Sequence, residues 1–386
     1  MRPTPPCVTH WAHRSWSFKG RFAATHHALC SIHSGLLQGL PPAQMQSKDA
    51  AVRPQRVKPN MRRREFITLL GGALTAWACA ARAQEPRKVV RIGLLGPLSA
   101  SAQASRVEAI RQGLRDHGYI EGTNLSIEYR WAEGRYERLL ELAGELVRAN
   151  VDVIITYGTP ASLAAKQATT TIPIVVALIG DPIVSGLVTS VSRLSGNVTG
   201  QSFFNPQLRA KRVELLKEVK PGIARVAVLL NPDNPASVPE FEAMEVTARS
   251  LGVSLQPFRL RGPSEFVSAF ESIEQAGAEA VETGDDGMVA GNLGAIAALA
   301  ARARLLSTGP KEVAQAGGLM GYGVDIFATY RRAGIFVDKI LKGARPADLP
   351  IEQATKFATV LNLRTARALG LDVPTATLLR ADEVIE

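Results

Sequence analysis

Short apolar runs alternate with amphipathic helix patterns along most of the chain after residue 88, and this alternation limits the possible fold more than any other feature. The runs are rich in Val, Ile and Leu and are bounded by Gly, Pro, Asn or Asp, which is typical of buried parallel strands. In the first half we expect strands at 89–95, 125–131, 152–157, 174–179 and 197–203, with helices at about 103–117, 136–149 and 160–168.

The pattern begins again after residue 206. A helix at 207–219 leads to the apolar run "RVAVLL" and then to the turn sequence "NPDNP". Further helices are expected at 237–251, 263–276 and 289–304, and strands at 225–230, 253–259, 279–283 and 305–308. The restart predicts an α/β protein with two similar lobes, each a doubly wound parallel sheet.

Two such lobes would be joined by a hinge with several chain crossings and would enclose a ligand cleft. Ligands bind at the carboxyl ends of the strands in sheets of this kind. We expect crossings near 200–207, 323–326 and 343–355, where Gly, Pro and Asn interrupt the patterns. Lobe 1 is expected to comprise 84–203 plus about 324–345, and lobe 2 to comprise 204–323 plus about 346–386.

The stretch "RRREFITLLGGALTAWACAARAQ" (62–84) has the three parts of an export signal. These parts are a basic segment, a short apolar segment and a small-residue cleavage site, Ala81-Arg82-Ala83. The apolar segment is shorter than the roughly 18 residues of a membrane span. We therefore expect residues 61–83 to be a signal peptide, cleaved near Ala83. It resembles a twin-arginine signal, and the choice between the twin-arginine and the general secretory route stays open. Residues 1–60 are expected to be a disordered upstream extension that is foreign to the functional protein.

The basic charge of the chain belongs to this leader. Residues 1–83 contain 12 Lys and Arg against 2 Asp and Glu, so the remainder has 33 residues of each sign. The expected mature protein is therefore neutral, which argues against nucleic acid as a partner. All three cysteines and five of the six histidines also precede residue 84. This excludes disulfides and the usual His/Cys zinc or nucleophile sites from the mature protein.

Catalytic residues and nucleotide-binding motifs are not predicted. The one remaining histidine, His117, is expected to be a helix-terminal residue. Phosphate-binding glycine loops of the known orders are absent from the sequence. The adjacent acids Asp285 and Asp286 are expected to lie in a loop, and a catalytic pair would need opposed environments. We therefore expect no cofactor, no metal and no enzyme activity.

The predicted strand ends of lobe 1 offer groups for recognition. Thr159 is expected to cap a helix that has Pro160 in its first turn, and the backbone at Ala161 would help to form a seat for a carboxylate. Asp181 follows the next strand and could accept hydrogen bonds from an ammonium. Ser99 and Ser101 follow the first strand. The alternatives are that Thr159 only caps its helix and that Asp181 only caps a turn.

Further ligand-binding residues are expected from lobe 2 and from a crossing between the lobes. Asn231 and Asp233 in "NPDNP", together with Asp285, would close over the other end of the ligand. Tyr322 and Gly323 would approach the body of the ligand. Together these residues predict a small polar ligand.

Residues 61–386 resemble the family of ABC-transporter substrate-binding proteins that includes the tryptophan/tyrosine-type periplasmic binders. The resemblance rests on stretches that span nearly the whole expected mature chain, among them "RQGLRDHGYIEGTNLSIEYRWAEGRYERLLELAGELV", "VDVIITYGTPASLAAKQATTTIPIVVALIGDPIVSGLV", "KRVELLKEVKPGIARVAVLLNPDNP", "AGGLMGYG" and "YRRAGIFVDKILKGARPADLPIEQATKF". The sequence differs from the family's pattern at 281–312, so the contribution of lobe 2 to specificity stays open.

The resemblance implies a hinged, two-lobed binder of the type I periplasmic class. Such a protein would be monomeric and would deliver a small solute, such as an amino acid, to an ABC permease in the inner membrane. The resemblance also supports the ligand-binding roles of "GTPA", "GDP" and "GYG". Two alternatives share the fold: a periplasmic module that presents its ligand to a receptor, and a periplasmic enzyme that uses carboxylates.

Overall fold

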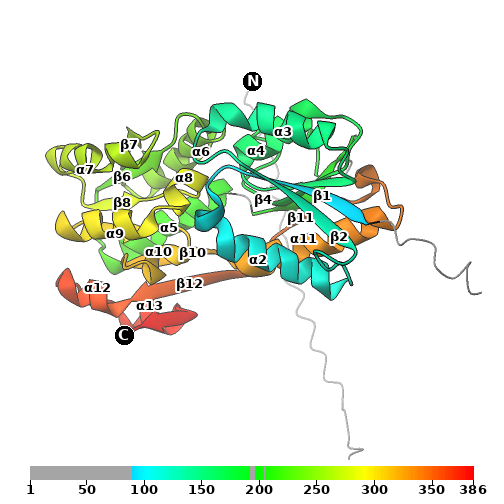
Figure 1. Ribbon diagram of the computed structural model, residues 1–386. Helices are drawn as coiled ribbons and strands as arrows, with labels where there is room; N and C mark the ends of the chain where they lie inside the picture. Colours follow the sequence, from blue (N-terminus) through cyan, green and yellow to red (C-terminus); the bar gives the residue numbers. More distant parts are fainter. Residues whose placement is uncertain (1–88, 192–195, 204) are drawn as a thin grey trace, which may run out of the picture. The chain divides into compact units, whose positions relative to one another are not determined.

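The computed structural model describes residues 89–191, 196–203 and 205–386. The predicted export signal and upstream extension lie outside these residues. The described chain forms two lobes, each built around a parallel sheet, and Figure 1 shows helices on both faces of each sheet. The predicted fold class is confirmed. No described helix has the length and apolar character needed to cross a membrane.

The sheet of lobe 1 has six parallel strands in the order β11-β5-β4-β3-β1-β2. The strands are β1 (Val90–Gly96), β2 (Leu125–Trp131), β3 (Val153–Thr156), β4 (Ile174–Ile179), β5 (Val198–Ser202) and β11 (Glu352–Gln353). The five strands predicted in this half are present with small shifts at their ends. The strands are parallel because crossover connections, most of them helical, bring the chain back to the same end of the sheet before the next strand begins.

Helices cover both faces of this sheet. On one face lie α2 (Ala100–Asp116) and α11 (Ile326–Leu341), and on the other lie α3 (Leu139–Arg148) and α4 (Thr159–Ala168). Successive residues of a strand point to opposite faces. Leu94 therefore packs against α2 and α11, whereas Leu95 packs against α3 and α4. These two buried clusters fix the carboxyl ends of the central strands.

Helices α2 and α11 approach each other closely because each has a glycine at the contact. A Cβ atom on Gly113 would lie 1.8 Å from the carbonyl oxygen of Arg331, and one on Gly334 would lie 2.3 Å from the carbonyl oxygen of Gly113. Both distances are shorter than any real Cβ contact. The two backbones can therefore touch only where the side chain is a hydrogen atom, as in other close helix crossings.

Lobe 2 has a parallel sheet of four strands in the order β7-β6-β8-β9. Its strands and helices are β6 (Arg225–Leu230), β7 (Ser254–Arg259), β8 (Ala280–Glu282), β9 (Leu306–Thr308), α5 (Asn205–Val219), α6 (Ser237–Ser250), α7 (Phe266–Gln275), α8 (Gly287–Ala290), α9 (Leu293–Arg302) and α10 (Glu312–Gln315). One predicted helix, 289–304, is in fact two helices, because the chain turns at Gly291 and Asn292 between α8 and α9.

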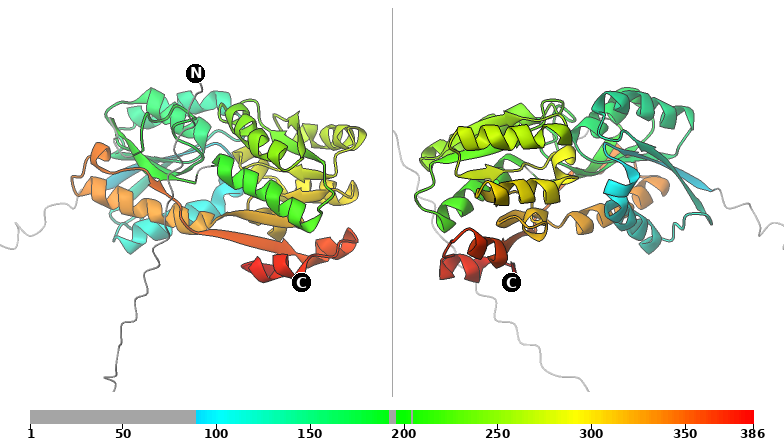
Figure 2. Two further views of the ribbon diagram at one scale, coloured as in Figure 1. Left: turned by 180° about the vertical axis from the view of Figure 1, so that it is seen from behind. Right: turned by 60° about the vertical axis from the view of Figure 1, so that its left-hand side comes forward.

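A third sheet, of three strands, was not predicted. Strand β10 (Met320–Val324) pairs antiparallel with β12 (Phe357–Asn362), which pairs parallel with β13 (Glu383–Ile385). The helices α12 (Leu363–Ala368) and α13 (Thr375–Arg380) lie between β12 and β13 in the chain. Figure 2 shows the orange-to-red ribbon of β12 running between the two lobes.

The chain passes between the lobes three times: from β5 to α5, from β10 to α11, and from β11 to β12. The first two passages lie within the ranges expected from the sequence. The third comes after Gln353, because β11 pairs with β5 in the sheet of lobe 1. This is later than the expected boundary near residue 345.

Candidate functional site

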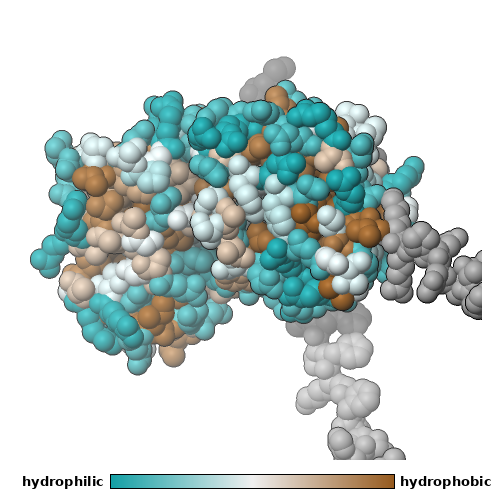
Figure 3. All heavy atoms as spheres, in the orientation of Figure 1, coloured by the Kyte–Doolittle hydropathy of each residue, from teal (hydrophilic) through white to brown (hydrophobic). Residues whose placement is uncertain are grey.

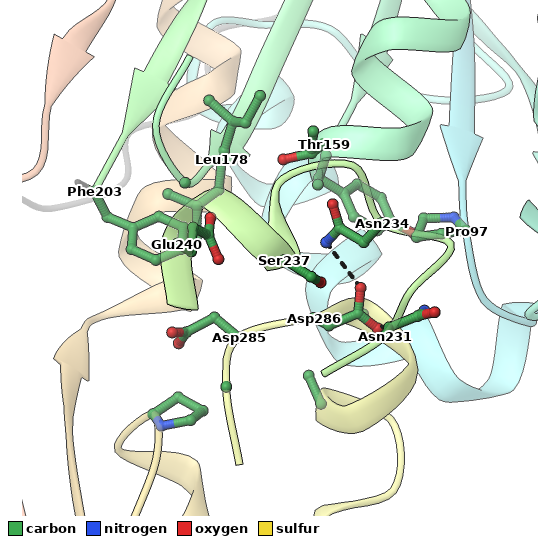
Figure 4. A pocket seen from close by; sticks show the side chains of 18 of the residues that line it. Pro97, Thr159, Leu178, Phe203, Asn231, Asn234, Ser237, Glu240, Asp285 and Asp286 are labelled. Atoms are coloured by element: carbon green, nitrogen blue, oxygen red, sulfur yellow. Dashed lines mark hydrogen bonds between the residues drawn. The ribbon is translucent and has the colours of Figure 1, made fainter. Parts of the chain in front are cut away.

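The carboxyl ends of both parallel sheets border one cavity, which is lined by both lobes. Figure 4 shows side chains of both lobes around this space, among them Thr159 and Leu178 from lobe 1 and Asn234, Ser237 and Asp286 from lobe 2. The cavity volume is about 100 Å³. An engineered cavity of about 150 Å³ can hold benzene, so this space suits a compact ligand.

Two buried arginines form an ion-pair network in the part of the cavity wall that belongs to lobe 2. Arg212 donates from both terminal nitrogens to Asp285, with N–O distances of 2.7 Å and 2.7 Å, and its Nη1 also lies 3.0 Å from Glu282 Oε1. Arg209 donates to Glu282 Oε2 at 3.1 and 2.5 Å. Burial alone would raise the pKa of Glu282, but the two guanidinium groups outweigh it and hold that pKa below its usual value. The charges of this network are paired with one another.

Asp286 joins four donors at the edge of the cavity. Its carboxylate accepts hydrogen bonds from Asn231 Nδ2 at 3.1 Å, Asn234 Nδ2 at 2.9 Å and the backbone nitrogen of Met288 at 2.9 Å. The fourth donor is the hydroxyl of Tyr136, 3.2 Å from Oδ1, which belongs to lobe 1. Burial raises the pKa of Asp286, and the donors act in the opposite direction. This carboxylate therefore links the two lobes.

Glycines in lobe 2 allow this contact between the lobes. A Cβ atom on Gly287 would lie 3.2 Å from the Tyr136 hydroxyl, and one on Gly291 would lie 2.8 Å from Leu98 Cδ1 of lobe 1. The Tyr136 side chain is partly buried, and its loss of contact with water together with the charge of Asp286 raises its pKa well above the ordinary value. The hydroxyl is therefore held as a neutral hydrogen-bonding group.

The wall from lobe 1 combines aromatic rings with polar groups that have few partners. Tyr157 directly follows β3, and its ring centroid lies 5.3 Å from that of Tyr330. Helix α4 begins at Thr159 after Gly158, which has φ 73° and leaves the helix without a side-chain cap. Arg106 of α2 reaches the same cavity. Phe203, after β5, adds a further apolar surface.

Five of the eleven residues predicted to bind ligand line the cavity. They are Thr159, Pro160, Asn231, Asp285 and Gly323. The predicted capping role of Thr159 is wrong, because Gly158 occupies the cap position and Thr159 is the first helical residue. Pro160 lies in the first turn, as expected. Asp285 is held by Arg212, so the free carboxylate expected from the sequence is instead an ion-pair partner.

The other six predicted residues do not line the cavity. Ser99 caps α2, and its hydroxyl oxygen lies 3.2 Å from that of Ser101. Ala161 is packed in the core of lobe 1. Asp233 forms an ion pair with Arg261 at the surface. The Tyr322 ring packs against Phe357 at an interplanar angle of 33°, and the Tyr322 backbone oxygen accepts a hydrogen bond from Arg212. Asp181 Oδ1 accepts from the backbone nitrogens of Ile183 and Val184 at 2.8 and 3.0 Å, which is the capping role left open above.

Several lining residues were missed by reasoning from the sequence. They include Gln103, Arg106, Tyr136, Tyr157, Arg209, Arg212, Asn234, Ser237, Glu240 and Asp286. Tyr157 could have been found, because it stands at a predicted strand end. The others lie on helices or loops whose orientation depends on tertiary packing. His117 caps the end of α2, as expected. No cluster of described residues has the ligands needed for a metal ion.

Residues 91–385 match the family model described as ABC transporter substrate binding protein. The chain belongs to this family. It is therefore a ligand-binding transport protein and not an enzyme. A curated relative, a tyrosine-binding protein of Clostridioides difficile strain R20291, is 24% identical over 261 residues, which are 67% of this chain and 75% of the relative.

Solved structures of similar proteins agree with the fold. A conserved domain protein of Vibrio cholerae has a TM-score of 0.73 at 27% identity, and the match covers 77% of this chain and 100% of that one. An ABC domain of Streptococcus pneumoniae in complex with L-Trp has a TM-score of 0.71 at 25% identity, covering 77% of this chain and 99% of that one. The match to the substrate-binding protein family extends over both lobes.

Proposed function

We propose that this substrate-binding protein is the periplasmic component of an ABC importer and captures a small, amino-acid-like solute in the cavity between its lobes. It then delivers the solute to a permease in the inner membrane. The observation that carries the proposal is the cavity, which both lobes line and which combines aromatic rings with polar groups. Sites for small molecules are generally concave and mostly apolar, with a few placed polar groups.

The nature of the solute follows from the two walls. Lobe 1 presents the positive end of α4 at Thr159, which favours a negatively charged group. Lobe 2 presents Asn231, Asn234 and Ser237, which hydrogen-bond polar groups. Two of the similar proteins are described with an aromatic amino acid, one as a tyrosine-binding protein and one in complex with L-Trp. An amino acid with a ring matches the chemical character of these walls, and a cavity of about 100 Å³ would have to widen by movement of the lobes to admit it.

Export is part of the same proposal. Residues 61–83 would direct the chain to the periplasm and would be removed at Ala83, so that the mature protein begins at Gln84. The mature protein would act as a monomer, because its cavity is completed by its own two lobes.

Titration calorimetry tests the proposal on the purified mature protein. L-Tyrosine, L-tryptophan, L-leucine and L-glutamate are the ligands, and D-glucose is the control for non-specific heats. We expect one site per chain and the tightest binding with an aromatic amino acid. Recovery of the ligand unchanged after denaturation supports a binder, whereas chemical conversion contradicts it. Failure of all four amino acids to bind would show that the solute belongs to another class.

A further inference from the structure

Arg106 is a charged residue of the cavity that makes no ion pair with a described carboxylate, although the buried Glu312 carboxylate interacts with its charge from a greater distance. Its Nη1 donates to Gln103 Oε1 at 3.3 Å, one turn earlier on α2. Gln103 is neutral and 1% exposed, so this bond orients the guanidinium without balancing its charge. In contrast, Arg209 and Arg212 are both paired with Glu282. Among the residues that the structure describes, no carboxylate forms an ion pair with Arg106.

The hydroxyl of Tyr157 is a second group in this wall without a partner. Tyr157 lines the cavity and is 3% exposed, and its hydroxyl has no hydrogen-bond partner within the described chain. Gly96 makes room for it, since a Cβ atom there would lie 2.3 Å from the hydroxyl oxygen. A buried hydroxyl without a partner is unfavourable. Its burial at a ligand cavity suggests that the ligand supplies the missing acceptor.

The start of α4 adds a third contribution on the same wall. Gly158 and Thr159 follow Tyr157 directly in the chain, and both line the cavity. This helix has ten residues, and no side chain caps its first turn. Its positive end therefore faces the cavity without a side-chain cap, in the same wall as Tyr157. A cation, a buried hydrogen-bond donor and a helix N-terminus all favour a negatively charged ligand group that accepts hydrogen bonds.

We infer that Arg106, Tyr157 and the N-terminus of α4 form a carboxylate subsite. The ligand carboxylate would accept hydrogen bonds from the Arg106 guanidinium and from the Tyr157 hydroxyl, with the positive end of α4 behind it. A carboxylate suits this set because it has two acceptor oxygens and one negative charge. The inference rests on the proposed capture of a solute in this cavity and adds that its anionic end binds to lobe 1.

Pairs of ligands that differ only in the carboxylate test the subsite. The pairs are L-tyrosine with tyramine and L-tryptophan with tryptamine, and their dissociation constants are measured by calorimetry. We expect wild-type protein to bind each amino acid at least about 100-fold more tightly than its amine, because a charge-assisted contact in a closed site is strong. Equal affinity within both pairs would overturn the subsite and leave the proposed function standing.

Substitutions test whether Arg106 provides the preference for ligands that have a carboxylate. Arg106→Gln should weaken amino-acid binding by about 100-fold and change amine binding by less than about threefold. The matched control is Arg115→Gln, which removes one positive charge from the exposed surface of the same helix. If Arg106→Gln weakens both members of a pair equally, or if Arg115→Gln has the same effect, the subsite is wrong. Absence of binding by all four ligands would contradict the proposed function itself, and the subsite with it.

Tyr157→Phe provides a test that does not depend on the stability of the Arg106 variant. The substitution deletes only the hydroxyl that lacks a partner. The ligand-free variant should therefore melt at the same temperature as wild type or higher. Its affinity for the amino acids should nevertheless fall by about tenfold, while its affinity for the amines stays the same. A variant with lower melting temperature and unchanged amino-acid affinity would assign the hydroxyl a structural role and overturn its place in the subsite.

Discussion

The Tyr136 hydroxyl of lobe 1 lies 3.2 Å from Asp286 Oδ1 of lobe 2, so a polar contact joins the lobes at the edge of the cavity. The same hydroxyl accepts a hydrogen bond from the backbone nitrogen of Met288 at 3.2 Å. A hinged binder forms such contacts only when its lobes come together. We therefore propose that the contact favours a closed form of the protein over an open one.

Tyr136→Phe should shift that equilibrium towards the open form. We expect ligand affinity to fall by about tenfold, since one hydrogen bond to a charged group is lost from the closed form only. Small-angle scattering at saturating L-tyrosine should still show compaction relative to the ligand-free protein, but at a higher ligand concentration than in wild type. Wild-type affinity in calorimetry would show that the contact does not favour closure.

Gly113→Ala should destabilise lobe 1 strongly. The added Cβ would lie 1.8 Å from a backbone oxygen of α11, so the two helices must separate. We expect the free energy of unfolding in urea to fall by about 3 kcal/mol. The control is Gly144→Ala in α3, where the nearest contact is the flexible end of Arg148 at 3.3 Å. That substitution should be neutral or stabilising, because alanine favours helix. Equal effects of the two would contradict the close crossing.

Glu312→Gln should change how stability depends on pH. The carboxylate oxygens of Glu312 are buried and lack hydrogen-bond partners among the described residues, and burial raises the pKa of this group, against the opposing effects of Lys311 and Arg106. The folded form therefore holds the proton more tightly than the unfolded form. This favours folding below the unfolded pKa, and the benefit is lost as the pH rises through the folded pKa.

The variant cannot ionise at this position, so its free energy of unfolding should increase relative to that of wild type as the pH rises. We expect similar free energies of unfolding at pH 4 and an advantage of about 1 kcal/mol for Glu312→Gln at pH 8. Urea unfolding at several pH values measures this difference. A difference that does not vary with pH would show that Glu312 does not titrate differently in the folded protein.

Asp181→Ala separates the two roles that the sequence allowed for this residue. The structure has its carboxylate capping the turn at Ile183 and Val184, outside the lining of the cavity. We expect a loss of about 1 kcal/mol in stability and unchanged ligand affinity. A loss of affinity without a change in stability would instead support the ammonium contact.

Sequencing the N-terminus of periplasmic protein tests the export proposal. We expect the first residue to be Gln84, because Ala81-Arg82-Ala83 has the small residues of a cleavage site. Material that begins before residue 61 would contradict this. Replacing Arg63 and Arg64 with Lys should reduce export if the twin-arginine route is used.

The sequence predicted most of the parallel strands well, because central strands such as β3 and β4 are short apolar runs in which every residue is buried. It did not predict β10 and β12, since "MGYGV" contains two glycines and reads as a loop. The structure explains why a glycine is needed here. A Cβ atom on Gly321 would lie 2.5 Å from the carbonyl oxygen of Pro310, so a larger residue would clash with that backbone. Close backbone approach of segments that are separate in the chain leaves no periodic signal.

The site was predictable where it depends on strand ends and was missed where it depends on packing. Thr159 and Asn231 follow strands directly, so topology places them at the cavity. Arg106 lies in the middle of a helix, and its direction depends on how α2 packs against α11. Asp181 also follows a strand, but its carboxylate turns back to its own loop. A turn cap and a ligand contact look the same in a sequence.

Exposed apolar side chains are scattered rather than gathered on one element. Hydrophobic residues in Figure 3 lie among hydrophilic ones, and exposed large apolar residues such as Val246, Val267 and Leu379 belong to α6, α7 and α13. Scattered exposure of this kind is normal for protein surfaces.

The order of elements along the chain also has a consequence for synthesis. Tyr330, Ala333 and Phe336 of α11 complete the core on one face of the sheet of lobe 1, yet they follow all four strands of the parallel sheet of lobe 2. When a growing chain reaches β5, that face of its sheet is covered by α2 and still lacks α11. Residues near the N-terminus generally fold first during translation, but here the ribosome must make the parallel sheet of lobe 2 before lobe 1 can finish its core.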